Sequence, residues 1–459
     1  MPVSRIGGFL PINPVSAGVP AAKGDSMNDA ISKKIAELTP GMIACRRDIH
    51  KHAESGCTEF RTASLIAKRL SELGYTLTIG KDAMAADQMM GVPPEADLAR
   101  YRERAVSQGA DPALVKRMED GRTGMWADMP CSGPGPCFAL RFDMDCNDVV
   151  ETDDPEHIPN KEGFASVNKG AMHACGHDGH VAVGLAVAEI LAGMKDQLKG
   201  SIRLIFEPGE EGSRGAGPMV AAGCVKGVDL IAGLHVGFQA ANKGDIVCGA
   251  KGFLATTKFD VTFTGKGAHS GAAPQDGKNA LLAACAATTN LHAIPRHGEG
   301  ATRITVGKLS GGQGRNVIPP SAFLAMETRG FTSELDEYMA TEARRILTAA
   351  AAMWDCGLDI KTVGCTKSGE SSPEMMAKVR AIAEKMPVFT NIMDLRDFGA
   401  SEDFSHMMTE VQKAGGTGTY IQAGTTRKAG HHNDHFDFDE ADLAPCAELL
   451  VRLVSEYLK

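Results

Sequence analysis

The side chains best suited to chemistry gather in one short stretch, MHACGHDGH at residues 172–180. Cys175 and His177 offer a thiolate and an imidazole, the ligand types that zinc and other transition ions favour in proteins. They are two residues apart, which suits a loop wrapped around an ion better than one face of a helix. The stretch therefore predicts a metal site that includes Cys175 and His177.

A simpler interpretation of the same stretch is a helix cap. The residues that follow, VAVGLAVAEILAG, predict an apolar helix whose amino end lies beside the loop. Asp178 is expected to cap this helix or to orient a histidine. His173 and His180 are expected to lie in the core or to hydrogen-bond a ligand, rather than to bind the ion themselves.

Two further groups of candidate side chains follow apolar runs. Glu210 and Glu211 end the run SIRLIFEPGEEG, and His235 ends LIAGLHV. Of two adjacent carboxylates, one can bind a metal ion while the other takes a proton from an activated water. Two solvated glutamates on a turn, and a buried core histidine, are the alternatives that these residues alone leave open.

The alternation of strand-like and helical segments predicts the scaffold. CFALRFDMD, SIRLIFE and VDLIAGLHV are apolar runs that suit buried strands, with helical stretches between them. This order predicts an α/β fold with a mixed, largely parallel sheet and helices on both faces. Such sheets bind ligands at the carboxyl ends of their strands. Because all three groups of candidate side chains fall at this edge, their coincidence favours one metal centre over three unrelated features.

The chain is long enough for two domains. Residues 1–27 predict a disordered tail, and 28–250 with 367–459 are expected to form the catalytic domain, in which 82–125 is an inserted helical segment. Between its two parts, 251–366 has a different pattern. TKFDVTFTG and ATRITVGKL alternate like antiparallel strands around an Ala-rich helical stretch, which predicts an inserted, smaller α+β domain.

The net charge and the distribution of cysteines indicate which class of partner and which compartment to expect. A formal net charge of −9 without a polybasic run does not fit nucleic-acid binding, so a small-molecule substrate is expected. Twelve scattered cysteines fit packing residues or ligands in a reducing cytoplasm better than a disulfide scaffold. No stretch is long and apolar enough to predict a membrane span.

Seven motifs, taken in order, resemble those of a known group of enzymes. They are MHACGHDGH, FEPGEEGSRGA, GLHV, GKGAHSGAAPQDGKNAL, GRNVIPPSA, GASEDFS and HHNDHFDFDE. Their order and spacing resemble the metal-dependent amidohydrolases of the aminoacylase and carboxypeptidase G group, in the branch with the hippurate and indoleacetyl-amino-acid hydrolases. The resemblance covers nearly all of residues 28–459. It implies a zinc-peptidase-like catalytic domain and an inserted dimerisation or lid domain.

The same resemblance implies a centre of two divalent ions, Mn²⁺ or Zn²⁺. Their ligands would be Cys175, as the bridge, with His177, Glu211, His235 and His432. Glu210 matches the general base that deprotonates the metal-activated water, and Asp145 in FDMD matches the carboxylate that orients the centre. Sulfur and nitrogen donors favour zinc, whereas the resemblance favours manganese, so the metal stays open.

One departure from the family leaves a ligand open. The family has a proline after the His-Asn of the last motif, where this chain has Asp434. His431 is therefore an alternative to His432, and we prefer His432. Two other departures remove no ligand: Glu207-Pro208-Gly209 replaces Gln-Pro-Ala, and Cys146 follows FDMD.

The resemblance also assigns residues of the inserted domain. His269 matches a histidine that reaches into the partner subunit's site, and Asn316 and Arg329 resemble residues that hold the substrate carboxylate or carbonyl. Since the site would then be shared between subunits, a homodimer, or a heterodimer with a homologous subunit, is expected.

The expected substrate is an N-acyl amino acid with a free carboxylate. An aroylated glutamate, p-aminobenzoyl-glutamate from folate breakdown, is the first candidate, and its hydrolysis would release p-aminobenzoate and glutamate. A broader N-acyl amino acid or peptide hydrolase is the alternative. A non-catalytic binding protein that keeps the fold, or a single structural zinc site, leaves the retained Glu210 unexplained.

Overall fold

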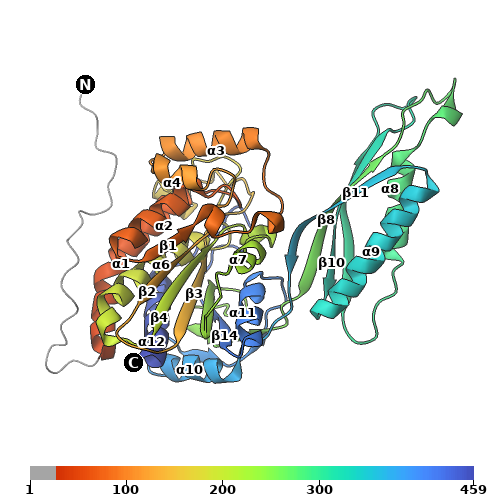
Figure 1. Cartoon of the computed structure of the whole chain (residues 1–459). Coiled ribbons are helices and arrows are strands. Elements are labelled where there is room, and N and C mark those ends of the chain that lie inside the picture. The colour runs from red at the N-terminus through yellow and green to blue at the C-terminus, as the bar shows by residue number, and fades with distance from the viewer. Residues whose placement is uncertain (1–26) are drawn as a thin grey trace, which may run out of the picture.

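The structure, a computed structural model, describes residues 27–459 as two bodies joined by two chain crossings (Figure 1). The predicted tail lies outside the described residues except for Met27, which begins helix α1 (Met27–Lys51). No helix among the described residues is long and apolar enough to cross a bilayer.

The larger body is built on an eight-stranded sheet in the order β1-β2-β4-β3-β5-β14-β6-β12. The strands are β1 (Thr76–Ile79), β2 (Met125–Pro130), β3 (Cys137–Asp143), β4 (Ser201–Glu207), β5 (Leu230–Val236), β6 (Asp245–Val247), β12 (Asn391–Met393) and β14 (Thr417–Ala423). The four central strands, β4, β3, β5 and β14, are parallel. β1, β2 and β6 pair in antiparallel fashion with their inner neighbours. The predicted mixed, largely parallel sheet is confirmed.

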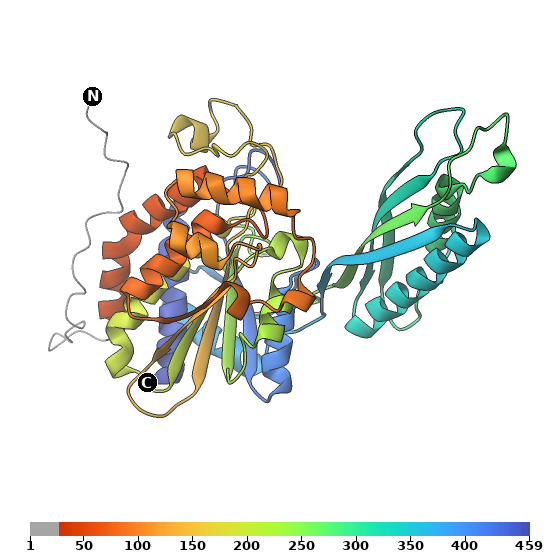
Figure 2. The same ribbon diagram turned by 45° about the horizontal axis from the view of Figure 1, so that its top comes forward.

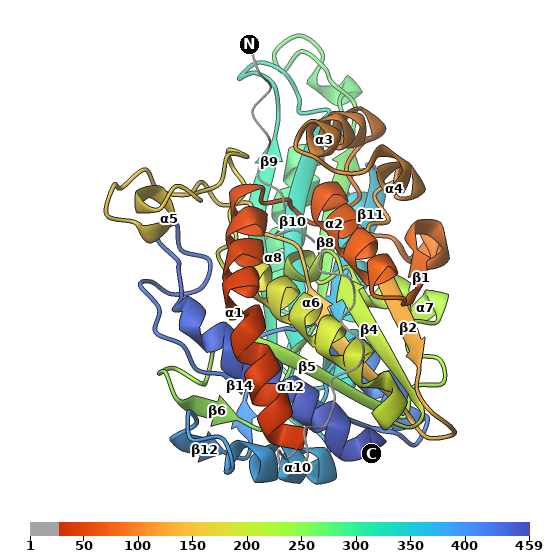
Figure 3. The ribbon, with the colours of Figure 1, turned by 90° about the vertical axis from the view of Figure 1, so that its left-hand side faces the viewer.

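Helices cover both faces of this sheet. On one face lie α1, α6 (His177–Met194) and α12 (Leu443–Leu458), which pack against one another in front of the strands (Figure 3). Nearly every residue of α6 is buried, as expected for a helix that is apolar on all sides. The other face holds α7 (Ala216–Ala222) and α11 (Phe404–Lys413). Each face of the sheet packs against its helices in a separate apolar core. These two close-packed cores fix the positions of the strand ends.

The remaining elements of the larger body lie around this framework. α2 (Phe60–Glu72) packs against α6 and against the two helices of the segment 82–125, α3 (Glu95–Ser107) and α4 (Pro112–Arg117). The side chain of Asp111 caps α4 by accepting a hydrogen bond from the Ala113 amide. A short helix, α5 (Ile158–Lys161), projects from the rim (Figure 3). α10 (Pro373–Ala383) packs on α12, and β7 (Ala250–Lys251) pairs with β13 (Arg396–Asp397).

The smaller body is a four-stranded antiparallel sheet in the order β11-β8-β10-β9. Its strands are β8 (Ala255–Thr264), β9 (Thr302–Gly311), β10 (Ser321–Gly330) and β11 (Gly357–Thr366). The helices α8 (Ala280–His292) and α9 (Ser333–Met353) cover one face and bury a separate apolar core. Alternating burial along β10 fits a sheet with one covered face. The start of β8 and the end of β11 join the smaller body to the larger one (Figure 2).

A buried network of charges ties α1 to the rim loop that carries α5. Glu151 is its centre: one carboxylate oxygen is 3.0 Å from His50 Nε2 and 3.0 Å from His157 Nε2, and the other accepts a hydrogen bond from the Ser166 amide. Burial acts to raise the pKa of Glu151, but the hydrogen bonds from His157 and His50 and the charge of His50 lower it from 4.5 to about 2.

This pKa shift predicts a pH-dependent contribution to stability. Because the pKa of Glu151 is lower in the folded than in the unfolded chain, its stabilisation is complete above pH 4.5 and is lost as the pH falls toward 2. At pH 6 we expect Glu151→Gln to lower the free energy of unfolding by on the order of 2 kcal/mol. Urea titrations from pH 6 to pH 3 should show the gap between the two proteins narrowing. A gap independent of pH would contradict this.

Candidate functional site

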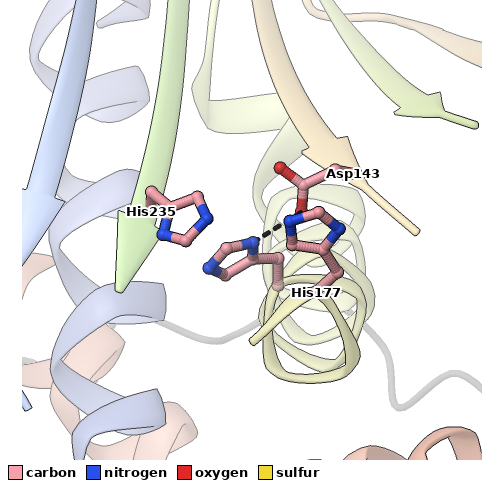
Figure 4. Close-up of side chains that lie close together, drawn as sticks. Asp143, His177 and His235 are labelled. Carbon is pink, nitrogen blue, oxygen red and sulfur yellow. Dashed lines mark hydrogen bonds and ion pairs between the residues drawn. The ribbon is translucent and has the colours of Figure 1, made fainter. Parts of the chain in front are cut away.

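The carboxyl ends of three adjacent strands and the amino end of α6 meet at one point of the larger body. β3 ends at Asp143, β5 carries His235 at its carboxyl end, and α6 begins at His177. Figure 4 shows these three side chains converging from their elements. The turn that follows β4 brings Glu210 and Glu211 to the same place. The strand-end site that the sequence predicts therefore exists as a spatial cluster.

The ligand atoms of Cys175, His177 and Glu211 lie within 4.8 Å of one another. His177 Nε2 is 3.8 Å from Glu211 Oε1, and Cys175 Sγ is 3.5 Å from His235 Nε2. Between Cys175 and His177 the chain turns through Gly176, whose φ of +99° is left-handed. A Cβ there would lie 2.6 Å from a methyl carbon of Val236, so only glycine lets the loop point both ligand atoms inward.

Backbone carbonyls set the tautomers of two histidines. His177 Nδ1 lies 2.9 Å from the carbonyl oxygen of Asp145, and His235 Nδ1 lies 2.8 Å from that of Val236. Each Nδ1 must carry the proton to donate these bonds, so each Nε2 has a free lone pair directed into the cluster. A metal-binding histidine has this arrangement, with its second nitrogen held by a hydrogen bond.

A bound cation fits the cluster because two of its polar atoms have no other partner. Among the described residues, His177 Nε2 and Glu211 Oε1 are buried and accept or donate no hydrogen bond. Buried polar atoms without partners are costly, and a divalent ion between sulfur, nitrogen and carboxylate donors would satisfy them. The site thus offers a metal the donors that it requires.

Asp145 positions the cluster through several contacts. Its carbonyl oxygen and Oδ1 lie near Nδ1 of His177, at 2.9 and 3.3 Å, and its Oδ2 accepts a hydrogen bond from the Glu211 amide at 3.1 Å. One buried carboxylate therefore holds a histidine together with the turn, residues 209–213, that carries Glu210 and Glu211. This geometry suits the orienting role expected of Asp145.

Asp143 is a site residue that the sequence analysis does not identify. Its Oδ1 lies 2.5 Å from His180 Nδ1 and 3.8 Å from His177 Nε2. His180 also accepts a hydrogen bond from the Val236 amide at Nε2, so both of its ring nitrogens are used by the protein. His180 thus supports the site and has no lone pair left for a metal. The only signal in the sequence is that Asp143 is the first aspartate of FDMD, two residues before Asp145.

Glu210 lies at the edge of the cluster, with Oε2 3.9 Å from His177 Nε2. Burial, followed by the negative charges of Glu402 and Glu211, raises the pKa of its carboxyl well above the ordinary value. Divalent cations at the site would offset this by favouring the ionised form. Its position, with only 12% of the side chain exposed, suits a group that accepts and returns a proton.

Buried residues that are far apart in the sequence stabilise the region around Glu210. Arg141 is fully buried and bonds Glu207 at 2.6 Å, Glu402 at 3.0 Å and also Asp143. Glu59 accepts hydrogen bonds from the Gly209 amide and the Thr123 hydroxyl, and so holds the residue before Glu210. Sequence reasoning does not identify these groups, because each becomes adjacent to the site only through tertiary packing.

His431 and His432 approach the cluster from different sides. His432 Nε2 lies 3.2 Å from Glu211 Oε2, and His431 Nδ1 lies 3.6 Å from Cys175 Sγ. His431 Nε2 accepts a hydrogen bond from the Phe238 amide, which leaves the proton on Nδ1 facing the sulfur. His432 has a φ of +63°, a conformation that a non-glycine residue keeps only where other contacts hold it. These features favour His432 as the ligand.

Metal content should distinguish the two histidines. We expect His432→Ala to lose at least one bound ion, because it removes a donor to the centre. In His431→Ala both ions should remain at saturating metal, with affinity weakened by about tenfold from the lost support of the thiolate. Elemental analysis after gel filtration measures both. The reverse pattern would make His431 the ligand.

The structure separates the three residues expected in the inserted domain. His269 and Asn316 are exposed neighbours: the Ser270 amide donates to the Asn316 carbonyl, and His269 pairs with Val317. Their loops lie at the end of the smaller body away from the larger sheet (Figure 1). Arg329 lies at the opposite end of β10, where it bonds Glu327 at 2.7 Å and lies 3.5 Å from Ser401. Arg329 therefore contacts the larger body of its own chain, whereas His269 and Asn316 lie beyond the far end of β8.

Comparison with known proteins agrees with this geometry. Residues 139–456 match the peptidase family M20/M25/M40. The chain is 46% identical over 421 residues to the indole-3-acetyl-aspartic acid hydrolase of Enterobacter agglomerans, covering 92% of this chain and 96% of that one. It is 44% identical over 425 residues to a subunit of the p-aminobenzoyl-glutamate hydrolase of Escherichia coli, with 92% and 97% covered.

A solved structure shows the same fold. The aminobenzoyl-glutamate utilization protein from Klebsiella pneumoniae is 39% identical and superposes with a TM-score of 0.80, covering 93% of this chain and 98% of that one. The seven motifs, the strand-end cluster and these relatives agree. The chain is a metal-dependent amidohydrolase and belongs to peptidase family M20/M25/M40.

Proposed function

We propose that this enzyme hydrolyses the amide bond of p-aminobenzoyl-glutamate, releasing p-aminobenzoate and glutamate. The observation that carries the reaction class is Glu210 beside the Cys175, His177 and Glu211 cluster at the strand ends. The substrate rests on the similarity to the p-aminobenzoyl-glutamate hydrolase of E. coli.

Five residues are proposed to hold two divalent ions, either Mn²⁺ or Zn²⁺. They are Cys175, His177, Glu211, His235 and His432. The position of Cys175 Sγ, 3.5 Å from His235 Nε2 and in the cluster with His177 and Glu211, supports its place among these ligands. Bound ions would supply a water of lowered pKa and polarise the amide carbonyl.

In this proposal, residues of the chain transfer the proton and keep the site in position. Glu210 takes a proton from the attacking water as the new carbon–oxygen bond forms, and returns it to the amine nitrogen as the carbon–nitrogen bond breaks. Asp145 keeps His177 and the Glu211 amide in position during both steps. The products are a carboxylate and an amino acid, so atoms and charge balance.

His269 is proposed to donate a hydrogen bond to the oxyanion in the partner subunit's site. Its Nδ1 accepts hydrogen bonds from the Gly271 and Ala272 amides, each at 3.1 Å. The proton of the neutral ring therefore lies on Nε2, which is free to donate. Asn316 beside it and Arg329 at the hinge end are proposed to hold the carbonyl or carboxylate of the substrate.

The distal position of His269 and Asn316 supports a dimer with shared sites. In this proposal 251–366 is the dimerisation and lid domain, and 28–250 with 367–459 is the catalytic domain. The partner is a second copy of the chain or a homologous subunit, since the E. coli relative is itself named as one subunit of its enzyme. All twelve cysteines are free, which fits a cytoplasmic location.

Indoleacetyl-aspartate is a second candidate substrate, because the relative named for it is 46% identical. The deciding experiment gives the purified chain, loaded with manganese or zinc, p-aminobenzoyl-glutamate, indoleacetyl-aspartate and hippurate, against a chelated control. Faster metal-dependent release of glutamate than of the other amino acids supports the proposal. Faster release of aspartate or glycine assigns a different acyl amino acid. No release from any substrate by the chain alone points to a heteromeric enzyme or to a non-catalytic binding protein.

A further inference from the structure

The turn that carries Glu210 and Glu211, residues 209–213, is hydrogen-bonded directly to the inserted sheet. Lys258 of β8 donates from Nζ to the carbonyl oxygen of Gly212 and to the hydroxyl of Ser213, both at 3.2 Å. The Cys365 amide of β11 donates to the Ser213 carbonyl at 2.7 Å. Three hydrogen bonds from two strands of one body thus end on the two residues that follow Glu211.

β11 is shaped to make this contact. Its pairing with β8 shifts between Thr362 and Gly364, so Val363 is an extra residue and Gly364 lies opposite Lys258. A Cβ on Gly364 would lie 2.2 Å from the Gly212 carbonyl oxygen, a distance that no side chain tolerates. A bulge and a glycine at the same point bring the strand against the turn, and bulges commonly re-aim a strand beside a functional site.

Ser213 connects this contact to the general base. It is 4% exposed and has a φ of +56°, a backbone conformation that costs free energy in a residue with a Cβ. Its amide donates a hydrogen bond to the Glu210 carbonyl at 2.6 Å. The surrounding contacts must hold this conformation, and Lys258 and Cys365 supply those that come from the inserted sheet.

We propose that Lys258 is a positioning residue for the reaction: through Gly212 and Ser213 it holds Glu210 in place whenever the inserted domain occupies this orientation. The proposal rests on the assignment of Glu210 as the general base. It makes catalysis depend on the lid of the same chain, in addition to any group from a partner. Lys258 acts here through protein oxygen atoms, and its charge is not used to bind the substrate.

Three variants test this. Lys258→Met removes both hydrogen bonds and keeps the aliphatic stem. Ser213→Ala removes the hydroxyl acceptor. Lys361→Met is the matched control, because Lys361 lies on the same sheet in β11, is exposed, and pairs with Asp359 at 3.7 Å. The measurements are kcat, KM, bound metal, and hydrogen–deuterium exchange of a peptide covering 208–216.

We expect Lys258→Met to lower kcat by about tenfold, because small displacements of a catalytic group are costly, with KM and bound metal unchanged. Exchange of 208–216 should rise, and Lys361→Met should match the wild type. Adding Ser213→Ala to Lys258→Met should lower kcat no further than Lys258→Met alone, since both act on one contact.

Other outcomes overturn the proposal. A raised KM at unchanged kcat would make Lys258 a substrate-binding residue, and losses in kcat that multiply in the double variant would show two independent effects. Unchanged exchange of 208–216 would show that Lys258 does not hold the turn. Since exchange requires no substrate, an inactive wild-type chain whose exchange responds to Lys258→Met would contradict the proposed function and leave the contact established.

Discussion

Glu210→Gln should lower kcat by about 10³-fold while the protein keeps its fold and both metal ions. Glutamine has the shape of a neutral carboxylic acid. Burial and the charges of Glu402 and Glu211 raise the pKa of Glu210 well above its ordinary value, so the surrounding protein groups tolerate a neutral side chain there. The substitution therefore removes the group that moves a proton and leaves the packing intact.

Glu211→Gln is the matched comparison for this prediction. Glu211 belongs to the cluster with Cys175 and His177, and it lies 3.2 Å from His432 Nε2. Its replacement should release metal and activity together. Elemental analysis and single-turnover kinetics separate the two variants. If Glu210→Gln also lost metal, Glu210 would be a ligand; if it kept more than a tenth of the activity, another group would be the base.

His269→Ala should lower kcat by about 10²- to 10³-fold, and mixing it with Glu210→Gln should restore activity. The loss is about that found when one donor to an oxyanion is removed. His269 follows the end of β8 at Thr264, whereas the other end of that strand contacts the larger body, so His269 lies away from the candidate ligands of its own chain. A symmetric dimer with shared sites would use each histidine in the partner's site.

The recovery expected on mixing can be stated in advance. Random pairing of equal amounts makes half of the dimers mixed, and each mixed dimer has one of its two sites intact, so activity should reach about a quarter of the wild type. Co-expression with two affinity tags isolates the mixed dimers. His297→Ala, in the same body, is the control that should stay active. No recovery on mixing would place His269 in its own subunit's site or outside catalysis.

The central site could be predicted from the sequence because each part of it is locally encoded. Cys175 and His177 precede an apolar helix, Glu210 and Glu211 follow one apolar strand, and His235 ends another. Parallel strands next to one another end at the same edge, so residues that are distant in the chain meet without further information.

Only the tertiary structure shows what surrounds that centre. β14, TGTYIQA, has no clear periodic pattern and is not predicted from the sequence, yet it pairs with β5 in register, with Gln422 opposite His235. Arg141 and Glu402 are 261 positions apart and come together only in the core between the sheet and α11. Buried ion pairs of this kind depend on packing of several elements, which no local pattern records.

The choice between neighbouring groups also depends on three-dimensional contacts. The sequence favours His432 and leaves His431 as an alternative, whereas the Phe238 amide and the left-handed backbone of His432 distinguish them in the structure. Similarly, Arg329 and His269 belong to one predicted domain, but the antiparallel sheet places them at opposite ends. The sequence alone thus determined the chemistry at the strand ends, because short-range apolar pattern specifies strands and helices. The tertiary structure decided which groups orient the candidate ligands, which groups neutralise buried charges and which groups reach the site, because those roles depend on distances between elements.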